Sequence, residues 1–133
     1  MEGIVLVFLG LIGLCILILI RLNICGKKAI GGITVATTKS ASEVRQIVEK
    51  QTRFKWDDKH SEADAQINKV HRTTGNMAGK GGTISVNIST EDDGTTIVHI
   101  WMSEWHKVAF GLVYVDGDVI WRKVKKIARK VAQ

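Results

Sequence analysis

The chain has 133 residues, 45% of them hydrophobic and 24% charged, and its formal net charge at pH 7 is +6. This length gives room for one small domain and excludes a second hydrophobic core. The chain has no proline, and its two cysteines, Cys15 and Cys25, both lie near the N-terminus. A disulfide framework or a cysteine-based metal site is therefore excluded from the rest of the chain.

An uncharged apolar stretch of 18 residues lies close to the N-terminus. At about 1.5 Å per helical residue it reaches roughly 27 Å, which approaches the thickness of a hydrocarbon core. It predicts a transmembrane anchor over residues 1–25. The residues expected to span the membrane are Gly3, Ile4, Val5, Leu6, Val7, Phe8, Leu9, Gly10, Leu11, Ile12, Gly13, Leu14, Cys15, Ile16, Leu17, Ile18, Leu19 and Ile20.

Positive charges follow the apolar stretch and none precedes it. The segment after the stretch is free of acids and carries Arg21, Lys27, Lys28 and Lys39. A cleaved secretory signal would instead place positive residues before its apolar core, so we expect the anchor to be retained. The positive-inside rule then predicts an outside N-terminus and a cytoplasmic soluble domain. Cys25 has two interpretations, an acylated cysteine or a small residue at the helix end.

The soluble α+β domain is predicted over residues 33–133, after a linker over residues 26–32. The whole segment from Leu22 to Gly32 is interpreted as a tether of at most about 36 Å. A β-branched run predicts a strand over residues 33–38. Ser40 and Glu43 match a capping box, and the apolar residues that follow recur at helical spacing, which predicts a helix from about 41 to 53.

Alternating patterns predict the strands of the sheet. Residues 65–72 form a weakly patterned strand, whereas residues 83–90 and 95–102 form a clear hairpin around the turn 91–94. The returning strand has apolar residues on both faces, so its second face either packs within the domain or is exposed to a partner. Residues 107–114 are either a further strand or the start of the closing helix, and the strand is favoured.

Asp116, Gly117 and Asp118 are expected to cap a closing helix from about 119 to 132. The predicted element order is β-α-β-β-β-(β)-α after the single transmembrane helix. The fold class is therefore α+β, a small antiparallel sheet of three to five strands with two helices against one face.

The closing helix is basic and amphipathic. An apolar stripe formed by Ile120, Val124, Ile127 and Val131 predicts packing on the sheet. Candidate contacts to anionic lipid headgroups or a partner are the remaining cations, Arg122, Lys123, Lys125, Lys126, Arg129 and Lys130. The alternative is a solvated basic face. Nucleic-acid binding is not expected, since no aromatic stacking motif accompanies these charges.

Tryptophans supply the second candidate surface. Trp101 and Trp105, near Met102, His106 and Phe110, are predicted to contact a partner or the membrane interface. No metal site is expected, since the four histidines and the acids of residues 57–64 lack ligand spacing. The glycine-rich segment 75–82 lacks the spacing and the hydroxyl of a phosphate loop, so no nucleotide cofactor is expected.

No nucleophile and base stand at a catalytic spacing, so the sequence does not predict an enzyme. It favours a binding, adaptor or accessory module at the membrane surface, whose partner is the bilayer surface itself, another membrane protein or a second copy of the chain. The alternative is a carrier of a small ligand or lipid, with an apolar pocket between the sheet and the closing helix. An enclosed pocket would favour the carrier, and a filled core would favour the adaptor.

Overall fold

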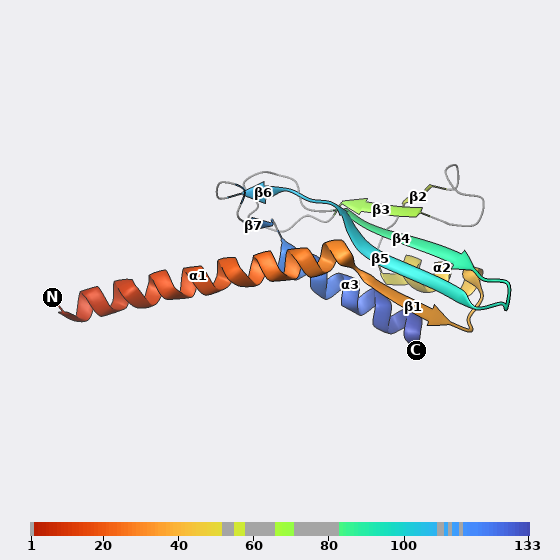
Figure 1. Ribbon diagram of the computed structural model, residues 1–133, viewed down its shortest axis with the longest axis horizontal. Helices are drawn as coiled ribbons and strands as arrows, with labels where there is room; N and C mark the ends of the chain where they lie inside the picture. The colour runs from red at the N-terminus through yellow and green to blue at the C-terminus, as the bar shows by residue number, and fades with distance from the viewer. Residues whose placement is uncertain are drawn as a thin grey trace.

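The protein consists of a long helix that projects from a small body of sheet and helices, as the computed structural model in Figure 1 shows. The structure describes residues 2–51, 55–57, 66–70, 83–108, 111, 113–114 and 116–133, and for residues 55–57, 66–70 and 108 it describes the backbone alone. Helix α1 (Glu2–Gly31) leads into the body, whose far end carries the C-terminus. The N-terminus lies at the free end of α1.

The main sheet has five antiparallel strands in the order β1-β5-β4-β3-β2. Their bounds are β1 (Ile33–Thr37), β2 (Lys55–Asp57), β3 (Gln66–Val70), β4 (Thr83–Thr90) and β5 (Thr96–Glu104). Strand β5 lies between β1 and β4, so β1 is an edge strand of the sheet. Strand β1 is also the element that follows α1 in the chain. These elements confirm the predicted α+β class.

The central hairpin β4–β5 confirms the sequence prediction. Ile84, Val86 and Ile88 of β4 are buried on one face, and Val86 is opposite Ile100 of β5 in the register. The connecting turn closes through Gly94, whose φ of 87° is readily adopted only by glycine. Burial alternates with a period of two along β5, whereas the first four residues of β4 are all buried. The alternation places one apolar face of β5 toward the helices.

Helices α2 (Ala41–Gln51) and α3 (Gly117–Ala132) cover this face. The predicted capping box is present in part, because the Glu43 backbone N–H donates to Ser40 Oγ at 3.2 Å. The apolar stripe of α3 is buried against the sheet, as expected. The fully buried stripe residues are Ile120, Val124, Ile127 and Val131. The core therefore lies between one sheet face and two helices.

The predicted strand over residues 107–114 is wrong. The structure has two short strands there, β6 (Lys107–Val108) and β7 (Val113–Tyr114), which pair with each other in a separate two-stranded sheet. Gly111 lies between them with a φ of 78°, a left-handed conformation that ends a strand. Gly111 interrupts this run of apolar residues, and it was the sequence signal against a single strand.

Helix boundaries also differ from expectation. Helix α3 begins at Gly117, and Asp116 before it has a φ of 59° and no side-chain capping hydrogen bond. Its backbone oxygen accepts the Ile120 N–H at 2.9 Å. Strand β3 lies within the predicted strand 65–72, and β2 was not predicted. The ends of that predicted strand and the last residues of the predicted helix 41–53 lie outside the described residues.

The segment interpreted as an extended tether is helical. Helix α1 is continuous to Gly31, and the expected linker over residues 26–32 forms its last turn and a half. Gly26 and Ala29 in this part are buried. Local composition suggested flexibility because a glycine pair ends the segment, yet packing on the domain stabilises the helix. The division of the chain into anchor, linker and domain stays a prediction.

Candidate membrane anchor and juxtamembrane surface

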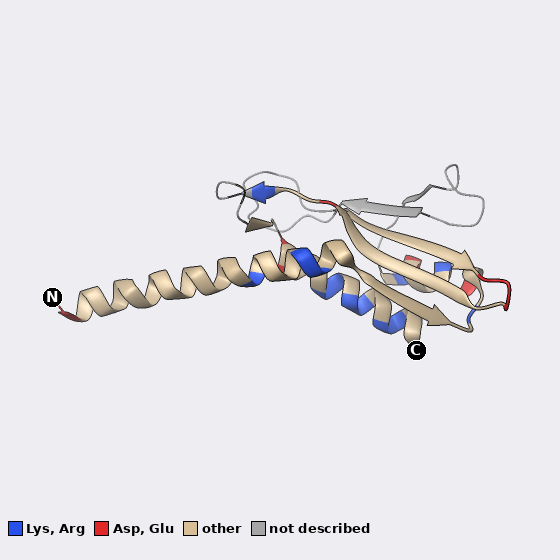
Figure 2. Ribbon diagram, in the orientation of Figure 1, with Lys and Arg blue, Asp and Glu red and all other residues tan. Residues whose placement is uncertain are grey.

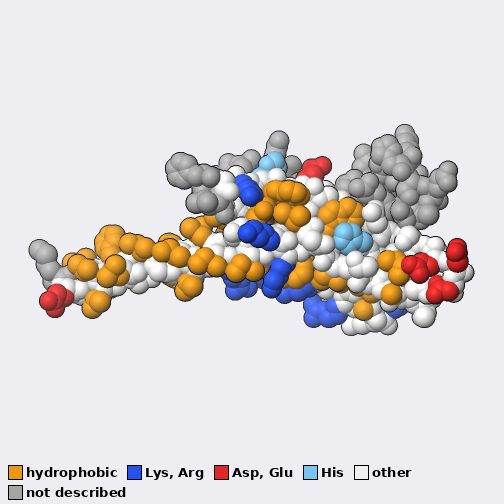
Figure 3. Space-filling view, in the orientation of Figure 1, with side chains coloured by type: hydrophobic (Ala, Val, Ile, Leu, Met, Phe, Trp, Pro, Cys, Tyr) orange, Lys and Arg blue, Asp and Glu red, His pale blue; other side chains and the backbone are white. Residues whose placement is uncertain are grey.

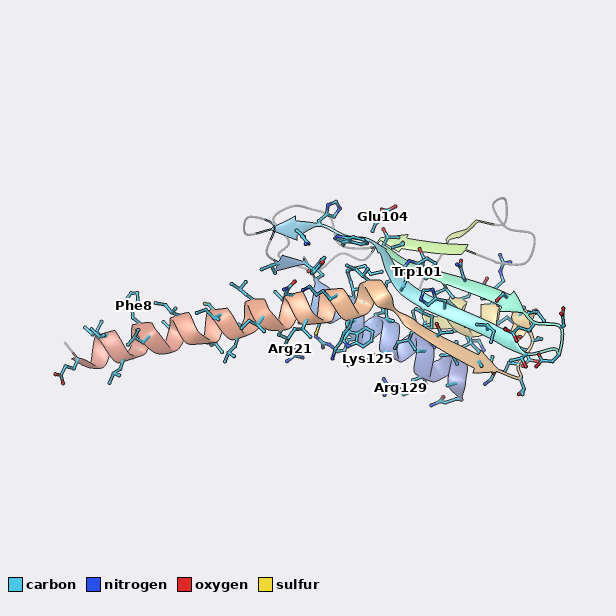
Figure 4. All side chains as sticks on the ribbon, viewed as in Figure 1. Phe8, Arg21, Trp101, Glu104, Lys125 and Arg129 are labelled. Atoms are coloured by element: carbon cyan, nitrogen blue, oxygen red, sulfur yellow. The ribbon has the colours of Figure 1, made fainter. Side chains whose placement is uncertain are left out.

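The first two thirds of α1 expose an apolar surface on all sides. The large hydrophobic residues from Ile4 to Ile20 have exposed fractions between 42% and 68%. The most apolar 18-residue window of the helix has a mean hydropathy of 3.2 and no buried residue. Phe8, labelled in Figure 4, projects away from α1 with no other element near it, and Figure 3 shows hydrophobic side chains along the whole rod. This helix is long and apolar enough to cross a membrane.

The last third of α1 is part of the domain. A Cβ added at Gly26 would lie 2.5 Å from ring carbons of Tyr114, and one at Gly117 would lie 2.5 Å from the Leu22 backbone oxygen and 3.0 Å from the Gly26 nitrogen. The start of α3 therefore touches the backbone of α1 directly. Glycine at both positions allows this close approach, since any side chain would push the two helices apart.

Gly32 directs the chain from α1 into the sheet. Its φ is 73°, and a Cβ there would collide with the Ile100 backbone oxygen and lie 2.6 Å from Trp101 Cβ. Next to this turn, His99 Nε2 is 3.1 Å from the Gly31 backbone oxygen, within hydrogen-bonding distance. The helix end is thus fixed on β5, and α1 and the sheet form one unit.

Trp105 belongs to a second group of side chains beside α1. Its ring meets the Tyr114 ring edge-on, with centroids 6.4 Å apart and an interplanar angle of 69°. Lys107 Nζ lies 4.6 Å from the centroid of the same Tyr114 ring. Tyr114 is 7% exposed and packs on Gly26. We call Trp105, Lys107 and Tyr114 the juxtamembrane cluster.

The two tryptophans of the predicted surface have different neighbours. Trp101 stacks on His99 on the open face of the sheet, with centroids 4.7 Å apart, whereas Trp105 packs on Tyr114. Met102 is fully buried in the core on the opposite face. His106 is exposed, and Phe110 lies outside the described residues. Strand alternation separates Met102 from Trp101.

The predicted basic residues lie along α3, where Figure 2 shows a series of Lys and Arg positions in blue on the ribbon. Lys123 is half-buried, and the exposed members are Arg122, Lys125, Lys126, Arg129 and Lys130. Arg122 forms an ion pair with Asp118 at 3.7 Å, and Lys125 Nζ lies 5.6 Å from the Trp121 ring centroid. In Figure 4, Lys125 and Arg129 project from the side of α3 turned away from the sheet.

A hollow of about 330 Å³ lies between this row and the end of α2. Its lining consists of Gln51, Arg122, Lys123, Lys126, Ile127 and Arg129. Among these described lining residues every charged side chain is a cation. Such a site favours a carboxylate or phosphate group. We call it the basic groove.

Helix α3 runs away from the exposed part of α1. Its first residue touches α1 at Leu22 and Gly26, and at its other end Lys39 Nζ donates to the Val131 backbone oxygen at 3.0 Å, beyond the end of β1. Figure 1 shows α3 and the last part of α1 running in the same direction. The lysine contact also supplies a partner and a positive charge to a terminal carbonyl of α3.

Among the residues that the structure describes, no group of three His, Cys, Asp or Glu side chains is arranged to hold a metal ion. The glycine-rich segment 75–82, His60, His71 and most of the acidic segment 57–64 lie outside those residues. The predicted absence of a metal or nucleotide site therefore stays a prediction. The carrier alternative also stays a prediction, although the described side chains that face each other across the core pack into one cluster.

Sequence reasoning missed several residues of the junction. Gly26 was assigned to the linker and Gly117 to the cap of the closing helix, and Tyr114 and Lys107 were placed in one continuous strand. Their pairing across β6 and β7 brings Lys107 opposite Tyr114. Gly111 was the available signal for the hairpin. No local signal pairs Gly26 with Gly117, because they are distant in the chain and meet only when α3 packs on α1.

No protein-family model, no curated protein and no solved structure matches this chain. The function must therefore be argued from the geometry of the chain itself.

Proposed function

We propose that this chain is a single-pass membrane protein whose α+β domain is a binding or adaptor module held at the membrane surface. One observation carries the proposal. A single continuous helix exposes apolar side chains over its first two thirds and gives its last third to the core of the domain. In water the exposed apolar surface is unfavourable, and a bilayer is the solvent that suits it.

The packing of the helix end supports an anchor that stays attached. Cleavage near Cys25 would remove the Leu22 backbone that Gly117 touches, and it would leave the buried Ala29 on a frayed helix end. A removable signal has no reason to supply core residues to the mature domain. The proposed orientation, with the domain in the cytoplasm, rests on Arg21, Lys27 and Lys28 after the apolar stretch.

For the basic groove we propose an acidic segment of another membrane protein as the occupant. A lipid surface suits this face less well, because α3 runs away from the anchor. Lys130 lies 13 residues after Gly117, or about 20 Å farther along the helix axis. This exceeds the Debye length of about 8 Å at physiological ionic strength, so attraction to headgroups is screened over most of the row.

Charge reversal in the groove tests this proposal. Lys126 is exposed and lies in the groove, whereas Lys50 of α2 is exposed and is not part of the lining. The full-length protein is crosslinked in its native membrane, and the stoichiometric companion is quantified for Lys126→Glu and for the matched control Lys50→Glu. We expect Lys126→Glu to weaken the association by about 1 kcal/mol, or roughly fivefold, with the control unchanged.

Two outcomes contradict the proposal in different ways. Release of the unmodified chain by alkaline extraction of membranes would disprove the anchor. Equal recovery of the companion with both variants, from a chain that stays in the membrane, would disprove the groove as the binding surface. Recovery of tightly bound lipid from the purified protein, without a protein companion, would favour the carrier.

A further inference from the structure

Exposed hydrophobic side chains mark a second surface of the domain. Among the described residues outside α1, Trp105 is the one large hydrophobic residue with an exposed side chain, at 41%. It belongs to the juxtamembrane cluster, so the exposed indole stands beside the Lys107 ammonium and the Tyr114 ring. A shallow surface hollow lined by Ser103, Glu104, Trp105 and His106 adjoins it.

The cluster lies near the level at which α1 leaves the hydrocarbon core. Ile20 is the last residue of the uncharged stretch, and Gly26, on which Tyr114 packs, follows six residues later, or about 9 Å along the helix. A headgroup layer is about 5–7 Å thick on each side of the bilayer. In Figure 1, β6 and β7 extend from this level back over α1 toward its N-terminal end. The level of Gly26 is thus about 2–4 Å beyond that layer. The long side chains of Trp105 and Lys107 can span such a gap.

The chemistry of the cluster matches that layer. Indole and phenol rings are enriched at membrane interfaces because one part of the ring is apolar and another forms hydrogen bonds. An ammonium near an anionic leaflet gains about 1 kcal/mol of attraction. Lys107 is exposed on the same strand pair, and Arg21, labelled in Figure 4, lies on α1 where the charged part of the helix begins.

We propose that Trp105 and Lys107 contact the lipid headgroups of the leaflet from which α1 emerges. The proposal rests on the proposed function, since it requires α1 to span the bilayer. The contact gives the domain a second fixed point, at a distance from the helix axis. One transmembrane helix sets the depth of the domain, and the second contact sets its rotation about that helix and so the direction in which the basic groove faces.

Fluorescence quenching by brominated lipid tests the contact. The full chain is reconstituted into vesicles of phosphatidylcholine and phosphatidylserine, with bromine on the acyl carbons nearest the headgroup. Replacement of Trp56, Trp101 and Trp121 by phenylalanine leaves Trp105 as the only indole. The matched control keeps Trp121 of α3 instead. We expect brominated lipid to remove most of the Trp105 emission and to leave the Trp121 emission nearly unchanged.

Labelling of Cys15 distinguishes failure of the membrane anchor from failure of the headgroup contact. Its thiol should be protected from a membrane-impermeant maleimide in intact vesicles, because it lies inside the apolar stretch. Labelling of Cys15 would overturn the anchor itself. A protected Cys15 with unquenched Trp105 would overturn the headgroup contact alone. A Trp105 ring that is shielded from solvent only at high protein concentration, and that brominated lipid does not quench, would lie against a second copy of the chain. This result would also overturn the proposal.

Substitutions of Lys107 test the electrostatic part of the headgroup contact. Lys107→Glu should reduce the quenching of Trp105 in vesicles that contain phosphatidylserine, and Lys107→Arg should retain it. Lys107→Arg should keep the unmodified thermal unfolding midpoint in detergent, since a guanidinium can also lie over the Tyr114 ring. Lys107→Glu loses this contact, worth about 0.5–1 kcal/mol, and its midpoint should fall by only a few degrees. Equal quenching for the two variants would remove Lys107 from the contact.

Discussion

The two parts of helix α1 differ in composition and in surroundings. Residues 4–20 are uncharged, and their large hydrophobic side chains are 42–68% exposed. Residues 22–31 carry two lysines and three glycines or alanines in their last six positions, yet they lie against α3, β5 and β7. The more hydrophobic part is the exposed one, and the more polar part contributes to the core.

This contrast fits the proposal that one helix meets two solvents. A core helix hides an apolar stripe and exposes a polar face, whereas the first part of α1 is apolar on every side. A bilayer is a solvent that suits such a surface. The second part does not need to be apolar on every side. Its small residues let the backbone of α3 approach closely and exclude water. A charge in the first part should therefore impair membrane insertion and leave domain stability unchanged. A larger side chain at the contacts of the second part should lower domain stability and leave insertion unchanged.

The largest effect should come from a charge in the first part. Leu11→Arg places a cation near the middle of the apolar stretch, where it opposes insertion by about 3 kcal/mol. We expect loss of resistance to alkaline extraction, whereas the unfolding of the domain stays unchanged because Leu11 touches no domain residue. Leu11→Phe is the control and should remain in the membrane. A lower unfolding midpoint for Leu11→Arg would contradict the separation of the two parts.

A side chain at the helix junction should have the reverse effect. Gly117→Val directs carbon atoms at the backbone of Leu22 and Gly26, and a backbone cannot rotate away. We expect a loss of about 2–3 kcal/mol and a midpoint at least about 10 °C lower in a thermal scan in detergent. Gly10→Val is the matched control, since a Cβ there meets nothing within 4 Å. Equal midpoints for both variants would mean that α1 and α3 are not in contact.

The turn from α1 into β1 should be somewhat less sensitive. Gly32→Ala combines a left-handed backbone with a collision at the Ile100 oxygen, for a cost of about 2 kcal/mol. Gly94→Ala in the β4–β5 turn has the same backbone problem in open space and should cost about 1 kcal/mol. Chemical denaturation of both variants measures the difference. If Gly94→Ala were the more damaging variant, the contact of the helix end with β5 would be disproved.

The smallest effect is expected far from α1, in the acidic turn at the distal end of the sheet that Figure 2 shows in red. Asp93 Oδ1 accepts the Thr95 backbone N–H at 2.8 Å, and this hydrogen bond lowers the pKa of Asp93. Because the unfolded chain has the higher pKa, the carboxylate stabilises the fold above that value. The contribution disappears as the pH falls through the lowered folded-state pKa.

The side chain of Asp93 is fully exposed, so the effect on stability is slight. A carboxyl titration followed by NMR should give a midpoint below that of an aspartate in an unstructured peptide. The variant Thr95→Pro removes the donating N–H and should return the midpoint toward the ordinary value. An unmodified protein whose Asp93 titrates at the ordinary value would disprove the charge-dependent hydrogen bond in this turn.

Periodic segments were the predictable part of this molecule. The β4–β5 hairpin follows from strict alternation around Gly94, and the stripe of α3 follows from apolar residues at helical spacing, and both are present. The segment 107–114 was not predicted correctly, because its six apolar residues outweighed one glycine. The juxtamembrane cluster could not be predicted at all, since Trp105 and Tyr114 meet only after β7 pairs with β6.

The sequence by itself determined an apolar span, the α+β class and a helix with one apolar and one basic side. These properties depend on residues close together in the chain, so periodicity and composition report them. Only the tertiary structure decided that the helix continues through the expected tether, that Gly26 and Gly117 bring α1 and α3 into backbone contact, and that the basic row runs away from the anchor. Each of these depends on the free energy of packing between distant segments, which no local pattern contains.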